Sequence, residues 1–277
     1  MGIGMFLFSA VDTTAKFLTT DLHPIQIVWA RQLGLLLGAV VLLVRFGPKL
    51  LHTAHPWLQI LRGTVAVCSA TLFIAAIVFV PLADAVAISF IAPFLVTLLG
   101  ALFLREPVGR RRWAAVSIGF LGALIIIRPG LGVMHPAAGF VILAAFFFAL
   151  RQIISRALSD TDQTATTVIY TALVGNALLI VPLLFVWQTP TLEQAVLLAA
   201  IAIVAAVAEV CVIKALELAM AVVVAPMHYS LILWGTIYGW LVFDQLPDVW
   251  TWVGTAIIFA TGVYTLRREY VLRRDAL

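Results

Sequence analysis

The sequence is divided into apolar runs of some twenty residues by short segments that contain charged residues, proline or glycine. A helix needs roughly 20 mostly apolar residues to cross the hydrocarbon core of a bilayer, so runs of this length predict membrane-spanning α-helices. The ten predicted helices lie at residues 2–19, 24–44, 58–79, 84–104, 112–128, 137–157, 164–187, 194–215, 222–243 and 249–267. Only short loops remain between them, and we therefore expect the membrane-embedded unit to be the whole protein.

The composition excludes an ordinary water-soluble protein. Hydrophobic residues make up 64% of the chain and charged residues 11%, with a mean hydropathy of +1.13, whereas about 25% of the residues of a soluble domain are charged. The sequence has no P-loop, which excludes a self-contained ATP-driven pump. It also has no Gly-x-Ser-x-Gly elbow and no His-Glu-x-x-His pair. We expect no catalytic residue, no metal, no cofactor and no nucleic-acid partner, and the lipid bilayer as surroundings.

Lysine and arginine residues predict the orientation, because cytoplasmic loops carry an excess of both. With the N-terminus inside, the cytoplasmic helix ends carry fourteen of the 17 basic residues. The fourteen are Arg45, Lys49, Arg62, Arg105, Arg110, Arg111, Arg112, Arg151, Arg156, Lys214, Arg267, Arg268, Arg273 and Arg274, and the outer half keeps Lys16, Arg31 and Arg128. We therefore expect a multi-pass protein of a bacterial inner membrane with both termini in the cytoplasm.

Parts of the first half recur in the second half after a shift of 140 residues. The recurring residues at one end of the repeat are Phe103, Pro107 and Gly122, which match Phe243, Pro247 and Gly262. Each half holds five predicted helices, and an odd number forces the second copy to insert upside down. Such inverted repeats are typical of secondary transporters, whose substrate site lies near the midplane. The predicted fold is an all-α polytopic membrane protein with two inverted five-helix repeats, residues 1–130 and 137–270.

Four segments carry a resemblance to a known family. They are Asp12-Thr-Thr-Ala-Lys16, Leu104-Arg-Glu-Pro107, Val224-Ala-Pro-Met-His-Tyr229 and Val242-Phe-Asp-Gln-Leu-Pro247. With the ten-helix pattern they resemble the EamA-type branch of the drug/metabolite transporter superfamily. The resemblance implies a central cavity walled mainly by helices 1, 3, 4, 6, 8 and 9, and transport of amino acids, S-adenosylmethionine, riboflavin or other solutes. The abrupt start departs from the family, whose members usually have a few more residues ahead of the first helix.

The first predicted helix has a polar face. Ser9, Asp12, Thr13 and Lys16 follow the i, i+3, i+4, i+7 spacing that places residues on one side of a helix. If the first hairpin turns near residue 22, Arg31 of the next helix lies at the depth of Asp12. In one interpretation these charges line the cavity, with the cations meeting a substrate carboxylate or phosphate and the aspartate a substrate amine or a proton. In the other, a buried ion pair locks the two helices and Lys16 extends to the interface.

The other half has uncharged polar residues at the equivalent positions. The shift of 140 residues maps Asp12 and Arg31 onto Gln152 and Thr171, a neutral pair. We include Gln152 among the candidate substrate-binding residues. Three aromatic residues at depth, Trp29, Tyr229 and Trp234, are further candidates because they could stack on a planar substrate, although core packing is the commoner role of such rings.

Glu209 and His228 flank a predicted inside turn near residue 219 at nearly equal distances, so we expect them to share a depth. A carboxylate beside an imidazole inside a membrane is a plausible proton relay. The alternative is that the two groups only hydrogen-bond each other or the backbone.

These features predict a secondary transporter that moves a small polar or zwitterionic metabolite by alternating access, with proton coupling through Glu209 and His228 as a further hypothesis. The alternative from another class is a membrane-embedded enzyme acting on a lipid-linked substrate. Such an enzyme needs a catalytic polar cluster near one interface, whereas the polar residues here pair near mid-depth. Monomer and homodimer both stay open.

Overall fold

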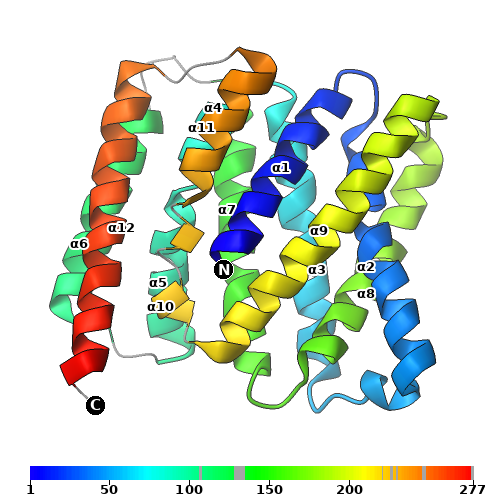
Figure 1. The fold of residues 1–277 in the computed structure, drawn as a ribbon, viewed down its shortest axis with the longest axis horizontal. Coiled ribbons are helices and arrows are strands. Elements are labelled where there is room, and N and C mark those ends of the chain that lie inside the picture. Colours follow the sequence, from blue (N-terminus) through cyan, green and yellow to red (C-terminus); the bar gives the residue numbers. More distant parts are fainter. Residues whose placement is uncertain are drawn as a thin grey trace.

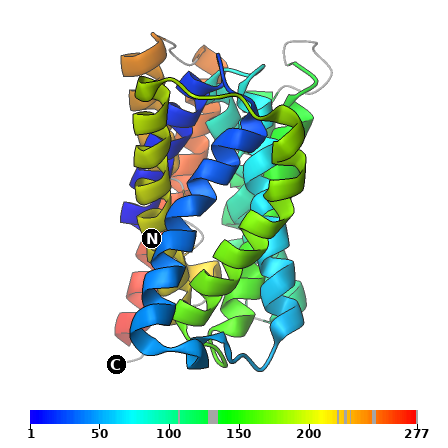
Figure 2. The ribbon, with the colours of Figure 1, turned by 90° about the vertical axis from the view of Figure 1, so that its right-hand side faces the viewer.

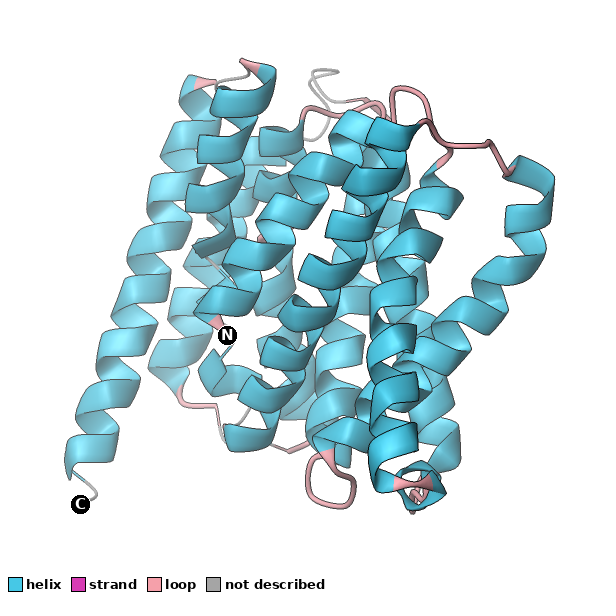
Figure 3. Cartoon of the chain, turned by 45° about the vertical axis from the view of Figure 1, so that its right-hand side comes forward, coloured by secondary structure: helices cyan, strands magenta, loops and turns pink. Residues whose placement is uncertain are grey.

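The computed structural model describes residues 1–105, 108–127, 135–219, 221–224, 227–228, 230–244 and 248–275. All regular secondary structure in these ranges is helical (Figure 3). The helices are α1 (Gly2–Leu18), α2 (Pro24–Phe46), the 3₁₀ turn η1 (Pro48–Leu51), α3 (Pro56–Ile77), α4 (Leu82–Ile88), α5 (Ile91–Phe103), α6 (Arg110–Ile127), α7 (Ala138–Leu158), α8 (Thr164–Val186), α9 (Leu192–Leu218), α10 (Ala221–Val224), α11 (Ser230–Phe243) and α12 (Val249–Asp275).

Within the described ranges, six stretches are long and apolar enough to cross a membrane. They are α2, α3, α7, α8, α9 and the stretch Asp84–Phe103 that joins α4 to α5. Shorter apolar stretches lie in α6, α11 and α12. Together with α1 they account for the ten predicted runs. The prediction of an all-helical polytopic membrane protein is confirmed.

The predicted span over residues 84–104 is confirmed as an apolar stretch, but a turn at Ser89 and Phe90 divides it into α4 and α5. Pro93, the third residue of α5, has no N–H to donate to the carbonyl of Ser89 four residues earlier. The N–H of Ala92 donates to that carbonyl instead, at 2.9 Å. The predicted helix over residues 222–243 is likewise seen as α10 and α11, and its Pro226 lies outside the described residues.

Helices of the first half pack on helices of the second half throughout the bundle (Figures 1 and 2). Helix α1 packs on α9 and α11, and α7 packs in the same way on α3 and α5. Helices α2 and α8 form one pair, and α6 and α12 form another pair at the opposite side of the molecule in Figure 1. A contact between a helix of the first half and a helix of the second half thus recurs between the equivalent helices of the other halves. This is expected for two repeats related by a pseudo-two-fold axis.

Small residues allow the closest of these contacts. A Cβ atom on Gly34 of α2 would lie 1.8 Å from the carbonyl oxygen of Ala202 on α9, so the two backbones approach too closely for any side chain at this position. A Cβ atom on Gly122 of α6 would lie 2.9 Å from the carbonyl oxygen of Gly254 on α12. Glycine therefore sets the distance between the two halves at both places.

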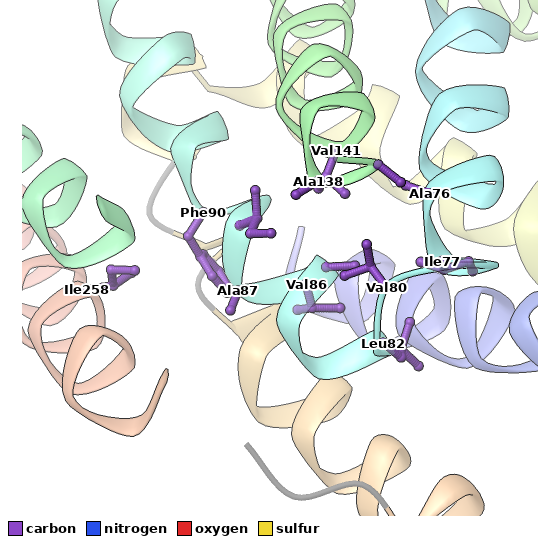
Figure 4. Packing of buried hydrophobic residues seen from close by; sticks show 13 residues of the cluster. Ala76, Ile77, Val80, Leu82, Val86, Ala87, Phe90, Ala138, Val141 and Ile258 are labelled. Atoms are coloured by element: carbon purple, nitrogen blue, oxygen red, sulfur yellow. The ribbon is translucent and has the colours of Figure 1, made fainter. Parts of the chain in front are cut away.

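A cluster of buried apolar side chains packs α4 against α3 and α7 (Figure 4). It includes Ile77 at the end of α3, Leu82 and Val86 on α4, and Val141 near the start of α7, all at most 1% exposed. Ile258 of α12 belongs to the same cluster. The packing fixes the short helix that forms one wall of the central cavity described next.

Candidate substrate-binding site

A cavity of about 110 Å³ lies among α1, α2, α3, α4, α5, α7, α11 and the segment that contains His228. The walls come from both halves of the chain, which is where transporters built from inverted repeats bind their substrates. The interruptions between α4 and α5 and between α10 and α11 both border this cavity, through Ser89 and Phe90 in one case and His228 in the other.

The lining of the cavity is mainly apolar, with four phenylalanine rings and a few charged groups. Phe8 of α1, Phe73 of α3, Phe148 of α7 and Phe90 in the turn between α4 and α5 supply the rings. The charged residues are Asp12, Arg31 and Arg151, and the polar ones include Ser69, Ser89 and His228. An apolar pocket with a small number of converging polar groups is the usual form of a site that binds an organic solute and fixes its orientation.

Asp12 and Arg31 lie together at the cavity, as their positions around the first hairpin predict. The Arg31 Nη1 atom is 3.9 Å from the Asp12 Oδ1 atom, and both side chains are largely buried, at 15% and 11% exposed. The Arg31 guanidinium also lies 4.8 Å from the centre of the Phe8 ring, a cation–π contact. Both interpretations of this pair apply to the structure, because it joins α1 to α2 and also faces the cavity.

Glu209 is held by two arginines. The Arg62 Nη2 atom donates to one carboxylate oxygen at 2.8 Å, and the Arg151 Nη1 atom donates to the other at 2.5 Å. Arg62 is completely buried and also donates to Ser155 (2.6 Å) and Thr171. The cluster connects α3 of the first half with α7, α8 and α9 of the second half, and its Glu209 and Arg151 border a smaller adjacent cavity.

These contacts correct one part of the sequence analysis and add to another. Arg62 and Arg151 were expected at cytoplasmic helix ends, but they are 0% and 5% exposed inside the bundle. The ion-pair partners of Glu209 are these two arginines, which the sequence did not predict. The reason is that α3 and α7, from different halves, pack directly against each other and bring their arginines to α9.

His228 lines the cavity, and its imidazole interacts with α7. The Gln152 Nε2 amide donates to the His228 Nε2 atom at 2.6 Å, which requires the imidazole tautomer that carries its hydrogen on Nδ1. The imidazole also meets the Phe148 ring edge to face, with the ring centres 5.1 Å apart. Gln152 and Thr171, the expected neutral pair, have separate partners, because Thr171 accepts from Arg62.

The other residues of the polar face of α1 point into the bundle, as predicted, but they are not among the residues that line the cavity. Ser9 and Thr13 are buried, and the Thr13 hydroxyl donates to the Ser9 carbonyl at 2.8 Å. The Lys16 ammonium donates to the Val80 carbonyl at 3.0 Å and lies 5.5 Å from the centre of the Phe243 ring. Lys16 therefore connects the end of α1 with the segment before α4 and with α11.

The aromatic candidates contact other aromatic residues. Trp29 meets Trp187 edge to face at 5.8 Å between ring centres, and Trp234 meets Phe6 in the same way at 4.8 Å. Both tryptophans thus pack between helices and are not among the cavity-lining residues. Tyr229 lies outside the described residues.

Arg62 and Arg151 were not predicted as site residues, because both lie within about two turns of a predicted helix end, where arginine usually anchors a span. One signal for Arg151 was present in the sequence. Phe148, Arg151 and Ser155 follow i, i+3, i+7 spacing and so share one face of a helix. That face carries a ring, a guanidinium and a hydroxyl, which indicates an inward orientation.

Comparison with known proteins identifies the family. The sequence model of the EamA-like transporter family matches residues 1–128 and 135–267. The chain is 28% identical to an S-adenosylmethionine uptake transporter of Rickettsia bellii, over 97% of this chain and 94% of that one. It is 28% identical to a riboflavin transporter of Rhizobium johnstonii, over 97% and 89%. A solved crystal structure shares the fold at 15% identity, with a TM-score of 0.72 over 96% of this chain and 94% of that one.

These matches agree with the helical bundle and its central cavity. The protein is a multi-pass membrane transporter for a small metabolite and not an enzyme, so the alternative of a lipid-modifying enzyme is excluded. The chain belongs to the EamA-like transporter family.

Proposed function

We propose that the protein is a secondary transporter that moves a small zwitterionic metabolite derived from an amino acid, by alternating access, with S-adenosylmethionine as the first candidate. One observation carries this proposal. The cavity between the two halves combines Asp12, Arg31 and Arg151 with four phenylalanine rings. Similarity to S-adenosylmethionine uptake transporters over nearly the whole chain supports the same substrate class.

The charges of the site match those of an amino-acid group. A guanidinium is the strongest common partner of a carboxylate, and a carboxylate such as Asp12 is the natural partner of a substrate ammonium. The phenylalanine rings suit a purine ring and the sulfonium of S-adenosylmethionine, since aromatic faces attract cations. Riboflavin fits the rings, but it has no ammonium group for Asp12 and no carboxylate for an arginine, so it matches the charges of the site less well than a zwitterion.

A thermal-stability screen of the detergent-purified protein tests the substrate class. The panel contains S-adenosylmethionine, amino acids, riboflavin, nucleosides and sugar phosphates. A ligand at about 100 times its dissociation constant stabilises the folded state by roughly 2.7 kcal/mol. We expect stabilisation by zwitterions, followed by uptake of the same compounds into proteoliposomes. Stabilisation confined to riboflavin or to sugar phosphates would contradict the proposal.

Asp12→Asn is expected to reduce uptake of S-adenosylmethionine at least tenfold or so, because the change removes the carboxylate that meets the substrate ammonium. The measurement is initial uptake into proteoliposomes that contain equal amounts of folded protein. Asp21→Asn is the matched control, because Asp21 is an exposed aspartate beyond the end of the same helix and is not among the cavity-lining residues. Equal uptake by the two variants would remove Asp12 from the binding site.

Proton coupling through His228 and Glu209 is a second part of the proposal. His228 is the member of this pair that lines the main cavity, while Glu209 borders the adjacent smaller one. We expect an imposed proton gradient to drive uptake by the wild type and to have no effect on His228→Gln or Glu209→Gln. If both variants keep the uptake and the pH dependence of the wild type, neither residue couples transport to protons.

The proposed location is the bacterial inner membrane, with both termini in the cytoplasm. The turns after α2, α5 and α7 and the end of α12 lie at one end of the bundle, the lower end in Figure 1. Most of the basic residues belong to these segments even without the buried Arg62 and Arg151. A green fluorescent protein fused to the C-terminus is expected to fluoresce, and alkaline phosphatase at the same place is expected to be inactive. The reverse pattern would invert the orientation.

A further inference from the structure

Arg151 has hydrogen-bonding capacity that the protein does not use. Its Nη1 atom donates to Glu209, but its Nη2 atom is buried and has no hydrogen-bond partner among the described residues. Arg62, the other arginine on the same carboxylate, uses all three of its nitrogens, toward Ser155, Thr171 and Glu209. A buried donor without a partner costs free energy, and a water, an ion or a ligand group that binds there would satisfy it.

The charges of the same region do not cancel. Among the described residues, three guanidinium groups, on Arg31, Arg62 and Arg151, face two carboxylates, on Asp12 and Glu209. One positive charge is therefore in excess inside the membrane-embedded bundle. Charges in this environment are expensive and are normally compensated by a partner. An anionic group of a ligand would supply the compensation.

Arg151 also has the right location. It borders both the main cavity and the smaller adjacent one, and among the described lining residues Arg31 is the other charged residue that borders both. Arg31 and Arg151 both line the smaller cavity, so their like charges face the same space. An anion held beside Arg151 would relieve this repulsion. Arg62 is not among the lining residues of either cavity, so it is behind Glu209 and away from a bound solute.

The surroundings hold the guanidinium of Arg151 in one orientation. Glu209 fixes one of its nitrogens at 2.5 Å, and the Phe148 ring lies 4.7 Å from its central carbon. A planar guanidinium with one nitrogen fixed and the other free presents a donor pattern that suits a carboxylate, because carboxylate oxygens accept in the same plane. A fixed donor also loses little conformational entropy when a ligand binds.

We propose that Arg151 is the residue that binds the carboxylate of the transported metabolite, and that Glu209 is the positioning residue that orients it. The inference rests on the proposed function and deepens it, because it assigns the two charged ends of a zwitterion to different residues. The carboxylate binds at Arg151 on α7, and the ammonium binds at Asp12 on α1. A zwitterion bound in this way contacts one helix from each half of the protein.

A matched pair of ligands tests this assignment. Decarboxylated S-adenosylmethionine differs from S-adenosylmethionine only in lacking the carboxylate. We would measure dissociation constants of both compounds by calorimetry with the full-length protein in detergent. The wild type is expected to prefer S-adenosylmethionine by a factor on the order of 30. Arg151→Gln is expected to bind the two compounds equally, within a factor of about three.

Two further variants separate binding from folding. Arg62→Gln removes a buried guanidinium that also pairs with Glu209, but Arg62 is not among the lining residues of either cavity. It is expected to lower thermal stability and to keep the preference for S-adenosylmethionine. If Arg151→Gln does not fold, Arg151→Lys keeps the charge and replaces the planar fork by a single ammonium, and it is expected to retain only part of the preference.

The outcomes distinguish the inference from the proposed function. If the wild type binds both compounds equally, or if Arg151→Gln keeps the preference, the inference is wrong and the zwitterion transporter stands. If chloride stabilises the protein and does not compete with S-adenosylmethionine, the excess charge is compensated by an inorganic anion and the inference is again wrong. If no zwitterion of the panel binds the wild type, the proposed function fails and the inference fails with it. If an amino acid binds in place of S-adenosylmethionine, the same comparison is made between that amino acid and its amide, which has no carboxylate.

Discussion

Glu209→Leu is expected to lower the free energy of unfolding by about 3–5 kcal/mol, because it leaves two buried guanidinium groups without their carboxylate. Arg62 and Arg151 are 0% and 5% exposed, so water cannot replace the lost partner. Each arginine donates to a different oxygen of Glu209, and both bonds disappear together. The measurement is the unfolding transition of the purified protein as the fraction of sodium dodecyl sulfate in mixed micelles rises.

Glu217→Leu is the matched control, because it removes a glutamate from the same helix in a solvated environment. Glu217 forms an ion pair with Lys214 at 2.9 Å, and Lys214 is 54% exposed. Exposed pairs of this kind contribute about 0–1 kcal/mol, so the control is expected to unfold nearly as the wild type does. If both glutamate variants unfold at the same point, the Arg62–Glu209–Arg151 cluster does not contribute to stability as we infer.

Gly34→Leu is expected to destabilise the fold by about 3 kcal/mol or more, because the contact between α2 and α9 has no room for a side chain. Even the first carbon of the new side chain would overlap the Ala202 carbonyl, at 1.8 Å from the oxygen and 2.4 Å from the carbon. Since both groups belong to helix backbones, the overlap can be relieved only if the helices move apart. That movement would also shift Arg31 on α2 relative to Glu209 on α9, so we expect weaker binding of S-adenosylmethionine.

Gly38→Leu provides the comparison on the same helix, one turn further along. A Cβ atom on Gly38 would meet nothing within 4 Å, so the larger side chain fits without displacement. Leucine is also a better helix former than glycine by somewhat less than 1 kcal/mol, which favours the variant slightly. We expect Gly38→Leu to be as stable as the wild type or slightly more stable, in the same detergent titration. Equal destabilisation by both substitutions would show that α2 and α9 are not in close contact.

The pairing of Asp12 with Arg31 could be predicted by counting residues from the first turn, but the partners of Glu209 could not be found in this way. Counting works for consecutive helices joined by a short turn, because each residue adds about 1.5 Å along both helices. Arg62 and Arg151 lie far from Glu209 in the sequence, on helices that meet it only through contacts between the halves.

The sequence by itself determined the helical, membrane-spanning character of the protein, because hydropathy and helix length are local properties that apolar runs of some twenty residues specify directly. It also predicted the polar face of α1 and the meeting of Asp12 with Arg31. Only the tertiary structure decided which helices of the two halves touch, and thereby that Arg62 and Arg151 share one buried carboxylate and that Arg151 faces the cavity. The physical reason is that these contacts depend on helix packing between segments roughly 60 to 150 residues apart, where backbone approach at residues such as Gly34 sets the geometry.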